Sequence, residues 1–112
     1  MEQRDKRILE KIIMYCRRIS ENLSRCKHDY TVFSQDHMLQ DACCMCVVQI
    51  GELVGQLSDE TKQRNQSIPW RAIKDTRNFY VHAYGSIDLK VIWATLLEDI
   101  PVLQEACKAL IL

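Results

Sequence analysis

Apolar residues recur at steps of three and four along most of the chain, and this spacing limits the possible folds more than any other feature. Between residues 3 and 25 the apolar stripe comprises Ile8, Ile12, Tyr15, Cys16, Ile19 and Leu23. A wider stripe comprises Leu39, Ala42, Cys43, Cys46, Val47, Ile50, Leu53, Val54 and Leu57. Such spacing puts apolar side chains on one face of a helix, and no strand-like alternation competes with it. Three glycines and two prolines in 112 residues leave few places for turns, so the sequence predicts long helices.

The first two predicted helices are separated by residues 26–33, where the apolar spacing is interrupted. Ser34 or Asp36 can cap the second helix, because a short polar side chain can accept a backbone N–H of the first turn. We expect this helix to run to about residue 58. The polar segment 58–68, "SDETKQRNQSI", is then predicted to be a connection with room for one helical turn.

Proline, glycine and capping residues predict the limits of the remaining helices. Pro69 suits the first position of a third helix, and Gly85 provides a left-handed ending for it. Asp88 or Ser86 can cap a fourth helix. Pro101 is predicted to open a last, short helix.

The length of the chain and the short connections between its predicted helices together predict one domain. A chain of 112 residues has room for a single modest core, and no linker divides it. Helices joined by short connections form up-and-down bundles. We therefore expect a single all-α domain over residues 1–112, an up-and-down bundle of four to five helices, and further burial of apolar surface by oligomerisation.

Charge and hydropathy limit the classes of partner. Basic and acidic side chains number 15 each, so there is no overall attraction to nucleic acid or to a membrane. Residues 62–77 carry five basic side chains against one acidic, which indicates an anion-facing patch or an ordinary solvated face. The sequence suggests neither a membrane span nor the apolar core of a signal peptide. We expect a cytoplasmic protein without a membrane partner.

The six cysteines favour buried thiols over disulfides or a metal site. They lie on helical patterns and not in loops: Cys16, Cys26, Cys43, Cys44, Cys46 and Cys107. In "CCMC", Cys43 and Cys46 share a helix face, but Cys44 points about 100° away from Cys43. A zinc site needs four converging ligands, and no second pair with suitable spacing follows. We therefore predict reduced thiols, no metal and no cofactor.

The stretch "RNFYVHAYG", residues 77–85, is unusually polar for the end of a buried helix. Arg77 offers a planar fork that suits phosphate, and a histidine such as His82 can exchange a proton near neutral pH. Asn78 can hold a neighbouring group in one orientation. Tyr84 can donate a hydrogen bond to an oxygen, or its own hydroxyl oxygen can be modified. On an ideal helix Arg77 and His82 diverge by about 140°. They can act together only if the helix unwinds near its end or if a second subunit contributes.

These residue types are suited to a ribonuclease that uses the 2′-hydroxyl of RNA as nucleophile. His82 would act as general base or acid, and Arg77 would stabilise the charge that develops on the phosphate. DNA, which has no such hydroxyl, would resist cleavage. The same side chains also fit a purely structural helix end, or a site that holds phosphate without cleaving it.

Nearby residues have simpler interpretations. Glu52, in "IGELVGQ", lies beside an apolar face and is either a surface carboxylate or close to a cleft. His28 and His37 flank a polar connection and are expected to be surface or capping residues. Phe79 and Tyr80 are expected to pack in the interior.

The spacing of the polar residues resembles the motif of a known family. The pattern has an arginine followed by an asparagine, a histidine five positions after the arginine, and a tyrosine two positions after the histidine. It resembles the motif of HEPN-domain proteins of the HepT-like ribonuclease toxin group. In this chain these positions are Arg77, His82, Tyr84 and Asn78. The stretches "IPWRAIKDTRNFYVHAYGSIDLKVIW", "LQDACCMCVVQIGEL" and "LLEDIPVLQEAC" also resemble the family, so the likeness covers nearly the full chain.

The resemblance implies a small helical homodimer whose two motif helices face a shared cleft. It implies a metal-independent endoribonuclease, the toxin of a toxin–antitoxin pair, with RNA as substrate. Its catalytic residues would be Arg77 and His82, with Asn78 and Tyr84 in support. The partner antitoxin would be a minimal nucleotidyltransferase that neutralises the toxin by binding it and by transferring AMP to Tyr84.

Two alternatives remain open from the sequence. One is a non-catalytic HEPN module that binds nucleotide or RNA, in which Arg77 and His82 hold a phosphate. The other is an interaction partner that docks on a nucleotidyltransferase through the region of Tyr84.

Overall fold

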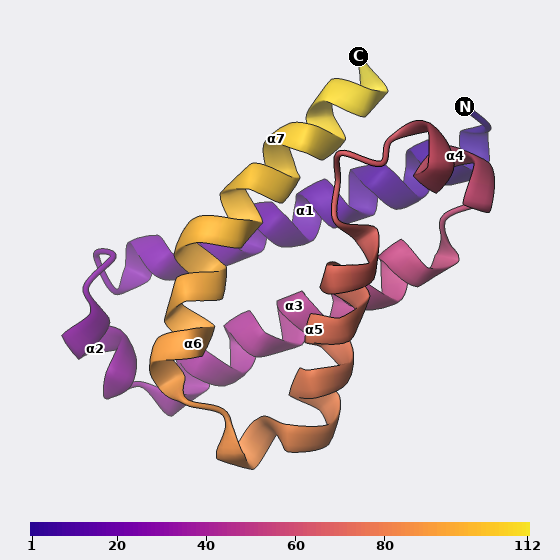
Figure 1. Ribbon diagram of the computed structural model, residues 1–112. Helices are drawn as coiled ribbons and strands as arrows, with labels where there is room; N and C mark the ends of the chain where they lie inside the picture. The colour runs from indigo at the N-terminus through magenta and orange to yellow at the C-terminus, as the bar shows by residue number, and fades with distance from the viewer.

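Helices account for almost the whole chain in the computed structural model, which describes residues 1–112 (Figure 1). The α-helices are α1 (Gln3–Arg25), α2 (Tyr30–Ser34), α3 (His37–Gln56), α4 (Asp59–Arg64), α5 (Trp70–Ala83), α6 (Leu89–Ala94) and α7 (Ile100–Ile111). A 3₁₀ turn, Tyr84–Ser86, follows α5, and a π-helical turn, Thr95–Asp99, joins α6 to α7. The prediction of an all-α fold is confirmed.

The long helices run up and down, with both termini at one end of the molecule (Figure 1). Helix α3 packs against α1 on one side and against α5 on the other, and α7 packs on α1. Because α5 lies chiefly on α3 and α7 chiefly on α1, these two outer helices diverge. The placement of α5 therefore depends mainly on its contacts with α3.

The apolar stripes predicted from the sequence form one continuous core. Leu9, Ile12, Cys16 and Ile19 of α1 are almost fully buried, and they join a cluster contributed mainly by α1, α3 and α7. Burial of this kind is the main favourable contribution to folding. The core therefore secures α1, α3 and α7, while α5 adds only Trp70 and Tyr80 to the fully buried set.

All six cysteines are free and buried, as the sequence predicts. Burial raises the pKa of Cys16, Cys43 and Cys44 to about 12. Burial also raises the pKa of Cys107, to about 11. These thiols therefore stay protonated and pack as small apolar side chains.

Helix α3 departs from the expectation that no segment resembles a membrane span. By length and mean hydropathy alone, His37–Gln56 is long and apolar enough to cross a bilayer. Half of this window is buried inside the protein. Its apolar character therefore has a plain explanation, because α3 lies between α1 and α5 and contributes side chains to the core on both sides.

The connection between α1 and α3 contains a helix that apolar spacing did not predict. Helix α2 is only five residues long, too short for a periodic pattern, and Asp29 caps it by accepting the backbone N–H of Thr31 at 2.8 Å. Two of its aromatic rings pack on Trp93, with ring centroids 4.9 Å away for Phe33 and 5.7 Å away for Tyr30. Tertiary packing therefore forms this helix where local sequence gives little signal.

The separation predicted between a fourth and a fifth helix is wrong. Helices α6 and α7 are continuous through the π-helical turn, and Pro101 lies within the first turn of α7. Proline has no N–H to donate, and inside a regular α-helix its ring would crowd the carbonyl four residues earlier, that of Leu97. A wider π turn immediately before the proline relieves this conflict, so the helix continues without a break.

Two of the predicted caps are confirmed and the glycine ending is not. Asp36 accepts the N–H of Leu39 at 3.1 Å, and Asp88 accepts that of Lys90 at 2.9 Å. Gly85 does not adopt a positive φ angle. Helix α5 instead tightens into a 3₁₀ turn that contains the glycine. Pro69 is the N-cap of α5, one position before the predicted one.

A buried carboxylate anchors the segment that leads into α5. Asp5 of α1 accepts hydrogen bonds of 2.5 Å from the hydroxyls of Ser58 and Thr61, which belong to the first turn of α4 and its cap. Burial alone would raise the pKa of Asp5, but these hydrogen bonds and the charge of Arg4 lower it below its usual value. Downstream, the indole of Trp70 donates to backbone carbonyls of this connection. Both contacts help to fix where α5 begins.

Candidate functional site

Helix α5 lies close against α3 where Arg77 packs over Gly51. A methyl group added at Gly51 would overlap Cβ of Arg77 and would lie 2.6 Å from its Cγ. Real carbon atoms keep about 3.5–4.0 Å apart, so only glycine fits here. The glycine therefore sets the depth at which the arginine lies on α3.

Two acceptors hold the guanidinium of Arg77. Its Nη2 forms an ion pair with Oε1 of Glu52, and its Nη1 donates to Oδ1 of Asn78 at 2.7 Å. Its Nε is shielded from solvent and has no hydrogen-bond partner. A guanidinium has five N–H groups, so two remain for a ligand. Since 28% of the Arg77 side chain is exposed, a phosphate can approach it.

The motif tyrosine is held by another carboxylate of α3. The hydroxyl of Tyr84 donates to Oδ1 of Asp41, and both side chains are exposed. Asp41 and Glu52 are eleven residues apart, which is close to three helical turns, so they project from nearly the same face of α3. One face of α3 therefore holds both the arginine and the tyrosine of the motif.

His82 is exposed and makes no hydrogen bond or ion pair within the chain. Helix α5 is regular through His82, and Ala83 already departs from helical dihedral angles, with φ −128° and ψ 19°. Arg77 and His82 therefore both lie on regular helix, and the divergence of about 140° applies to them. The helix changes its geometry only after the histidine. Unwinding of the helix end therefore does not bring the imidazole to the guanidinium in this chain.

The two aromatic residues between them behave differently from each other. Tyr80 is buried, as predicted, but Phe79 is 53% exposed, so its expected place in the interior is wrong. Phe79 is three residues before His82, on the same side of α5. Sequence reasoning also missed Asp41. The only sequence signal for it was its spacing from Glu52 on an otherwise apolar helix.

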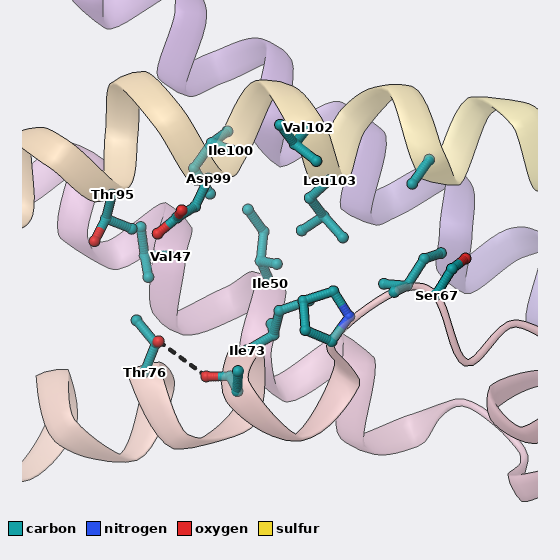
Figure 2. Close-up of a pocket in the computed structure, with 14 residues that line it drawn as sticks. Val47, Ile50, Ser67, Ile73, Thr76, Thr95, Asp99, Ile100, Val102 and Leu103 are labelled. Carbon is teal, nitrogen blue, oxygen red and sulfur yellow. Dashed lines mark hydrogen bonds between the residues drawn. The ribbon is translucent and has the colours of Figure 1, made fainter.

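A largely apolar groove of the molecule lies away from these residues. This groove of about 330 Å³ opens between α5 and the π turn with α7, and α3 forms its floor (Figure 2). Ile50, Ile73 and Leu103 line it. Its polar side chains are Ser67, Thr76, Thr95 and Asp99. None of the predicted site residues contributes to this lining.

The basic segment 62–77 is less available to anions than its composition suggests. Arg64 pairs with Glu60 at 2.8 Å, and Arg77 pairs with Glu52. Arg71 and Lys74 are exposed on α5. The anion-binding capacity of this segment is therefore spread along α5 and does not form a single concentrated patch.

No group of three or more His, Cys, Asp or Glu side chains is arranged to hold a metal ion anywhere in residues 1–112. His28 and His37 are both exposed, as expected for surface residues.

Comparison with known proteins places the chain in a family. The model of the family described as "Ribonuclease HepT-like" matches residues 9–110. "Putative RNase TTE0752" of Caldanaerobacter subterraneus is 28% identical over 92% of this chain and 90% of its own length. "Probable ribonuclease HepT" of Thermococcus cleftensis is 35% identical over 64% of this chain and 66% of its own. "Putative RNase MJ1380" of Methanocaldococcus jannaschii is 26% identical over 69% and 71%.

No solved structure matches the chain significantly. The family match nevertheless covers all of α3 and α5 and α7 up to residue 110, and with them every residue of the site. The chain belongs to the HepT-like ribonuclease family.

Proposed function

We propose that this member of the HepT-like ribonuclease family is a metal-independent endoribonuclease that cleaves RNA at a cleft between two copies of the chain. Family membership supports ribonuclease activity, and the relatives are named as ribonucleases. The observation that carries the proposal is the state of the motif. Arg77 is oriented and partly open to solvent, and His82 is exposed with no partner that would occupy its imidazole.

The cleavage step uses the nucleophile that RNA itself supplies. The 2′-hydroxyl gives its proton to a base, and its oxygen bonds to the adjacent phosphorus. The bond from phosphorus to the 5′-oxygen breaks, and that oxygen takes a proton from an acid. The products are a 2′,3′-cyclic phosphate and a 5′-hydroxyl end. No water has to be activated for this step, which is why a metal is not needed.

Each side chain of the motif has a role in this scheme. The two unused N–H groups of Arg77 donate to non-bridging phosphate oxygens, whose charge grows in the transition state. His82 acts as base or acid, and two copies of the chain would supply one imidazole for each role. Asn78 supports the arginine by accepting from its Nη1.

A second copy solves the geometric problem that α5 poses. Within one chain, Arg77 and His82 point about 140° apart and cannot engage one phosphate. Two α5 helices packed around a twofold axis can direct both residues toward a shared groove. Exposed apolar side chains beside His82, at Phe79 and Val81, support burial of this surface in a dimer.

The antitoxin role also belongs to the proposal. We propose that a minimal nucleotidyltransferase binds the chain and transfers AMP to the hydroxyl of Tyr84. The Tyr84 residue is 41% exposed. The modified oxygen no longer donates to Asp41, and the new phosphate brings negative charge and bulk beside the RNA site. The free thiols of the chain support a reducing, cytoplasmic location.

The first experiment tests cleavage. Purified protein is incubated with an RNA and with DNA of the same sequence in the presence of chelator. We expect cleavage of RNA only, with cyclic phosphate ends, and its loss in His82→Ala and in Arg77→Ala. Arg64→Ala is the matched control, since Arg64 forms an ion pair of similar type on α4, outside the motif. Binding of RNA without cleavage by the wild type would refute the proposal and favour a non-catalytic binding module.

The second experiment tests modification. The chain is expressed with a minimal nucleotidyltransferase, and its mass is measured before and after digestion. We expect one added AMP on the peptide that contains Tyr84, and none in Tyr84→Phe. An AMP on the Tyr30 peptide instead, or none on the wild type, would contradict this part of the proposal.

A further inference from the structure

Glu52 makes a contact with Arg77 that neither the fold nor the motif accounts for. The carboxylate pairs with Nη2 of the arginine beside Gly51, where Arg77 packs directly on the backbone of α3. We propose that Glu52 is a positioning residue for Arg77, which fixes the plane of the guanidinium so that its free N–H groups face the substrate. This inference rests on the proposed function, because it takes Arg77 as the group that binds the phosphate.

The backbone contact alone does not orient the guanidinium. Gly51 fixes the position of Cβ and Cγ of Arg77, but the torsions beyond Cγ remain free to rotate. Glu52 engages one terminal nitrogen and Asn78 engages the other. A planar group held at two corners keeps one orientation, and its two unused donors then point in fixed directions.

A purely stabilising role explains the pair less well. The Arg77 and Glu52 side chains are 28% and 42% exposed, and partly exposed pairs of this kind contribute little to folding. The shielded Nε of Arg77 has no acceptor, which is unfavourable for stability. An arginine selected for folding alone would have that donor satisfied. Glu52 therefore serves the orientation of the guanidinium more than it serves the fold.

The negative charge of Glu52 predicts how its removal should change kcat and KM. Glu52 offsets part of the positive charge of Arg77, so removing the carboxylate makes the site more attractive to an anion. Removing it also frees the guanidinium to rotate away from the geometry that the transition state requires. We therefore expect Glu52→Ala to lower kcat while KM stays unchanged or falls. A loss of phosphate affinity would raise KM instead.

The kinetic test compares variants of Glu52 in two backgrounds. In the wild-type background we expect Glu52→Ala to lower kcat about 10- to 100-fold, since a displacement of about 1 Å in a catalytic group costs about 100-fold. Glu52→Gln keeps an acceptor of the same shape and should lose less. Glu60→Ala, which breaks the surface pair with Arg64, is the matched control and should keep the wild-type kcat.

The second background carries Arg77→Lys, which keeps the charge but not the planar fork. If Glu52 acts through Arg77, Glu52→Ala should change kcat there by less than about twofold, because coupled residues are not additive. A drop as large as in the wild-type background would overturn the proposal, since the carboxylate would then act by another route.

A readout without RNA separates this inference from the proposed function. Restricted rotation of the Arg77 guanidinium should give separate NMR signals for its terminal N–H groups, assigned by their absence in Arg77→Lys. We expect these signals to merge in Glu52→Ala and to persist in Glu60→Ala, with the folded fraction of each variant checked by circular dichroism. Unchanged signals in Glu52→Ala would overturn the positioning role. If the wild type cleaves no RNA but its signals respond as expected, the proposed function fails and Glu52 still orients Arg77.

Discussion

Two glycines on α3 offer a matched pair of substitutions that tests the close approach of α5. Gly51 lies under Arg77, whereas a methyl group at Gly55, one turn later on the same helix, would meet no atom within 4 Å. Both positions gain helix propensity when glycine becomes alanine, by about 1 kcal/mol inside the helix at Gly51 and by about half as much near its end at Gly55. Only Gly51→Ala creates a clash. The difference between the two variants therefore reports chiefly the cost of separating α5 from α3.

The size of the effect follows from the contact geometry. A methyl group at Gly51 would lie 2.6 Å from Cγ of Arg77 and closer still to its Cβ. Because Cβ is attached to the backbone, α5 must move by at least about 1 Å to restore normal carbon contacts. Overpacking of this kind costs about 3 kcal/mol at the upper end of its usual range. After the gain in helix propensity, Gly51→Ala should lose about 2 kcal/mol of unfolding free energy.

Gly55→Ala should be more stable than the wild type by about 0.5 kcal/mol, since it lies close to the end of α3. Thermal unfolding followed by circular dichroism measures both variants. For a chain of this size the loss in Gly51→Ala corresponds to a fall in Tm of roughly 8 °C. The same displacement of Arg77 should lower RNA cleavage by about 100-fold in the folded protein. Equal Tm values for the two variants would refute the claim that Arg77 lies on the bare backbone of Gly51.

Two further predictions concern buried groups elsewhere in the chain. Hydrogen bonds hold the pKa of Asp5 below its unfolded value, so the stability that it contributes is present above the unfolded pKa and is lost as pH falls through the folded pKa. Asp5→Asn should lose about 1.5–3 kcal/mol at pH 7, measured by urea unfolding, and this deficit should shrink toward pH 3; a constant deficit would contradict the argument. The buried thiols, such as Cys16 and Cys43 with pKa values of about 12, should not react with a thiol reagent at pH 8 until the chain unfolds. Rapid labelling of Cys16 or Cys43 in the native protein, located by mass spectrometry, would show that the α1–α3 interface opens in solution.

Local features of the sequence predicted the parts of the fold that local interactions determine. The stripe from Ile8 to Leu23 gave the first helix with its observed bounds, because one apolar face is enough to specify an amphipathic helix. Asp36 and Asp88 were predicted as caps because capping needs only a side chain and the N–H groups two or three residues later.

Features that depend on tertiary packing were not predicted. Helix α2 forms where Phe33 packs on Trp93, which lies sixty residues later in the chain. No periodic pattern in the sequence predicts such a contact. The π turn before Pro101 depends on the whole helix staying packed on α1, which makes a wider turn less costly than a break. The ending of α5 was assigned to Gly85, yet the hydroxyl of Tyr84 bonds to Asp41 in the same region. In each case the deciding partner is remote in sequence.

The candidate site shows the same division. Residue chemistry and spacing select Arg77, Asn78, His82 and Tyr84 as candidates, which stays a prediction, but they say nothing about the register of α5 on α3. That register determines that Glu52 meets the arginine. Helical periodicity assigns a residue to a face, and it leaves the sliding of one helix along another undetermined.

The same helix geometry explains why the motif is chemically incomplete within one chain. A spacing of five residues on a regular helix separates a guanidinium from an imidazole, whereas a spacing of four would place them together. Helix α5 stays regular through His82, so bending within the chain does not correct this separation. The arginine is held against α3 and the imidazole is left facing solvent, and the two can share a phosphate only if a second copy of α5 is present. For a phosphodiester that spans two nucleotides, the dimer that we propose would have an advantage, because it would allow acid and base to approach from opposite sides of the phosphorus, as attack by one oxygen and departure of the other require.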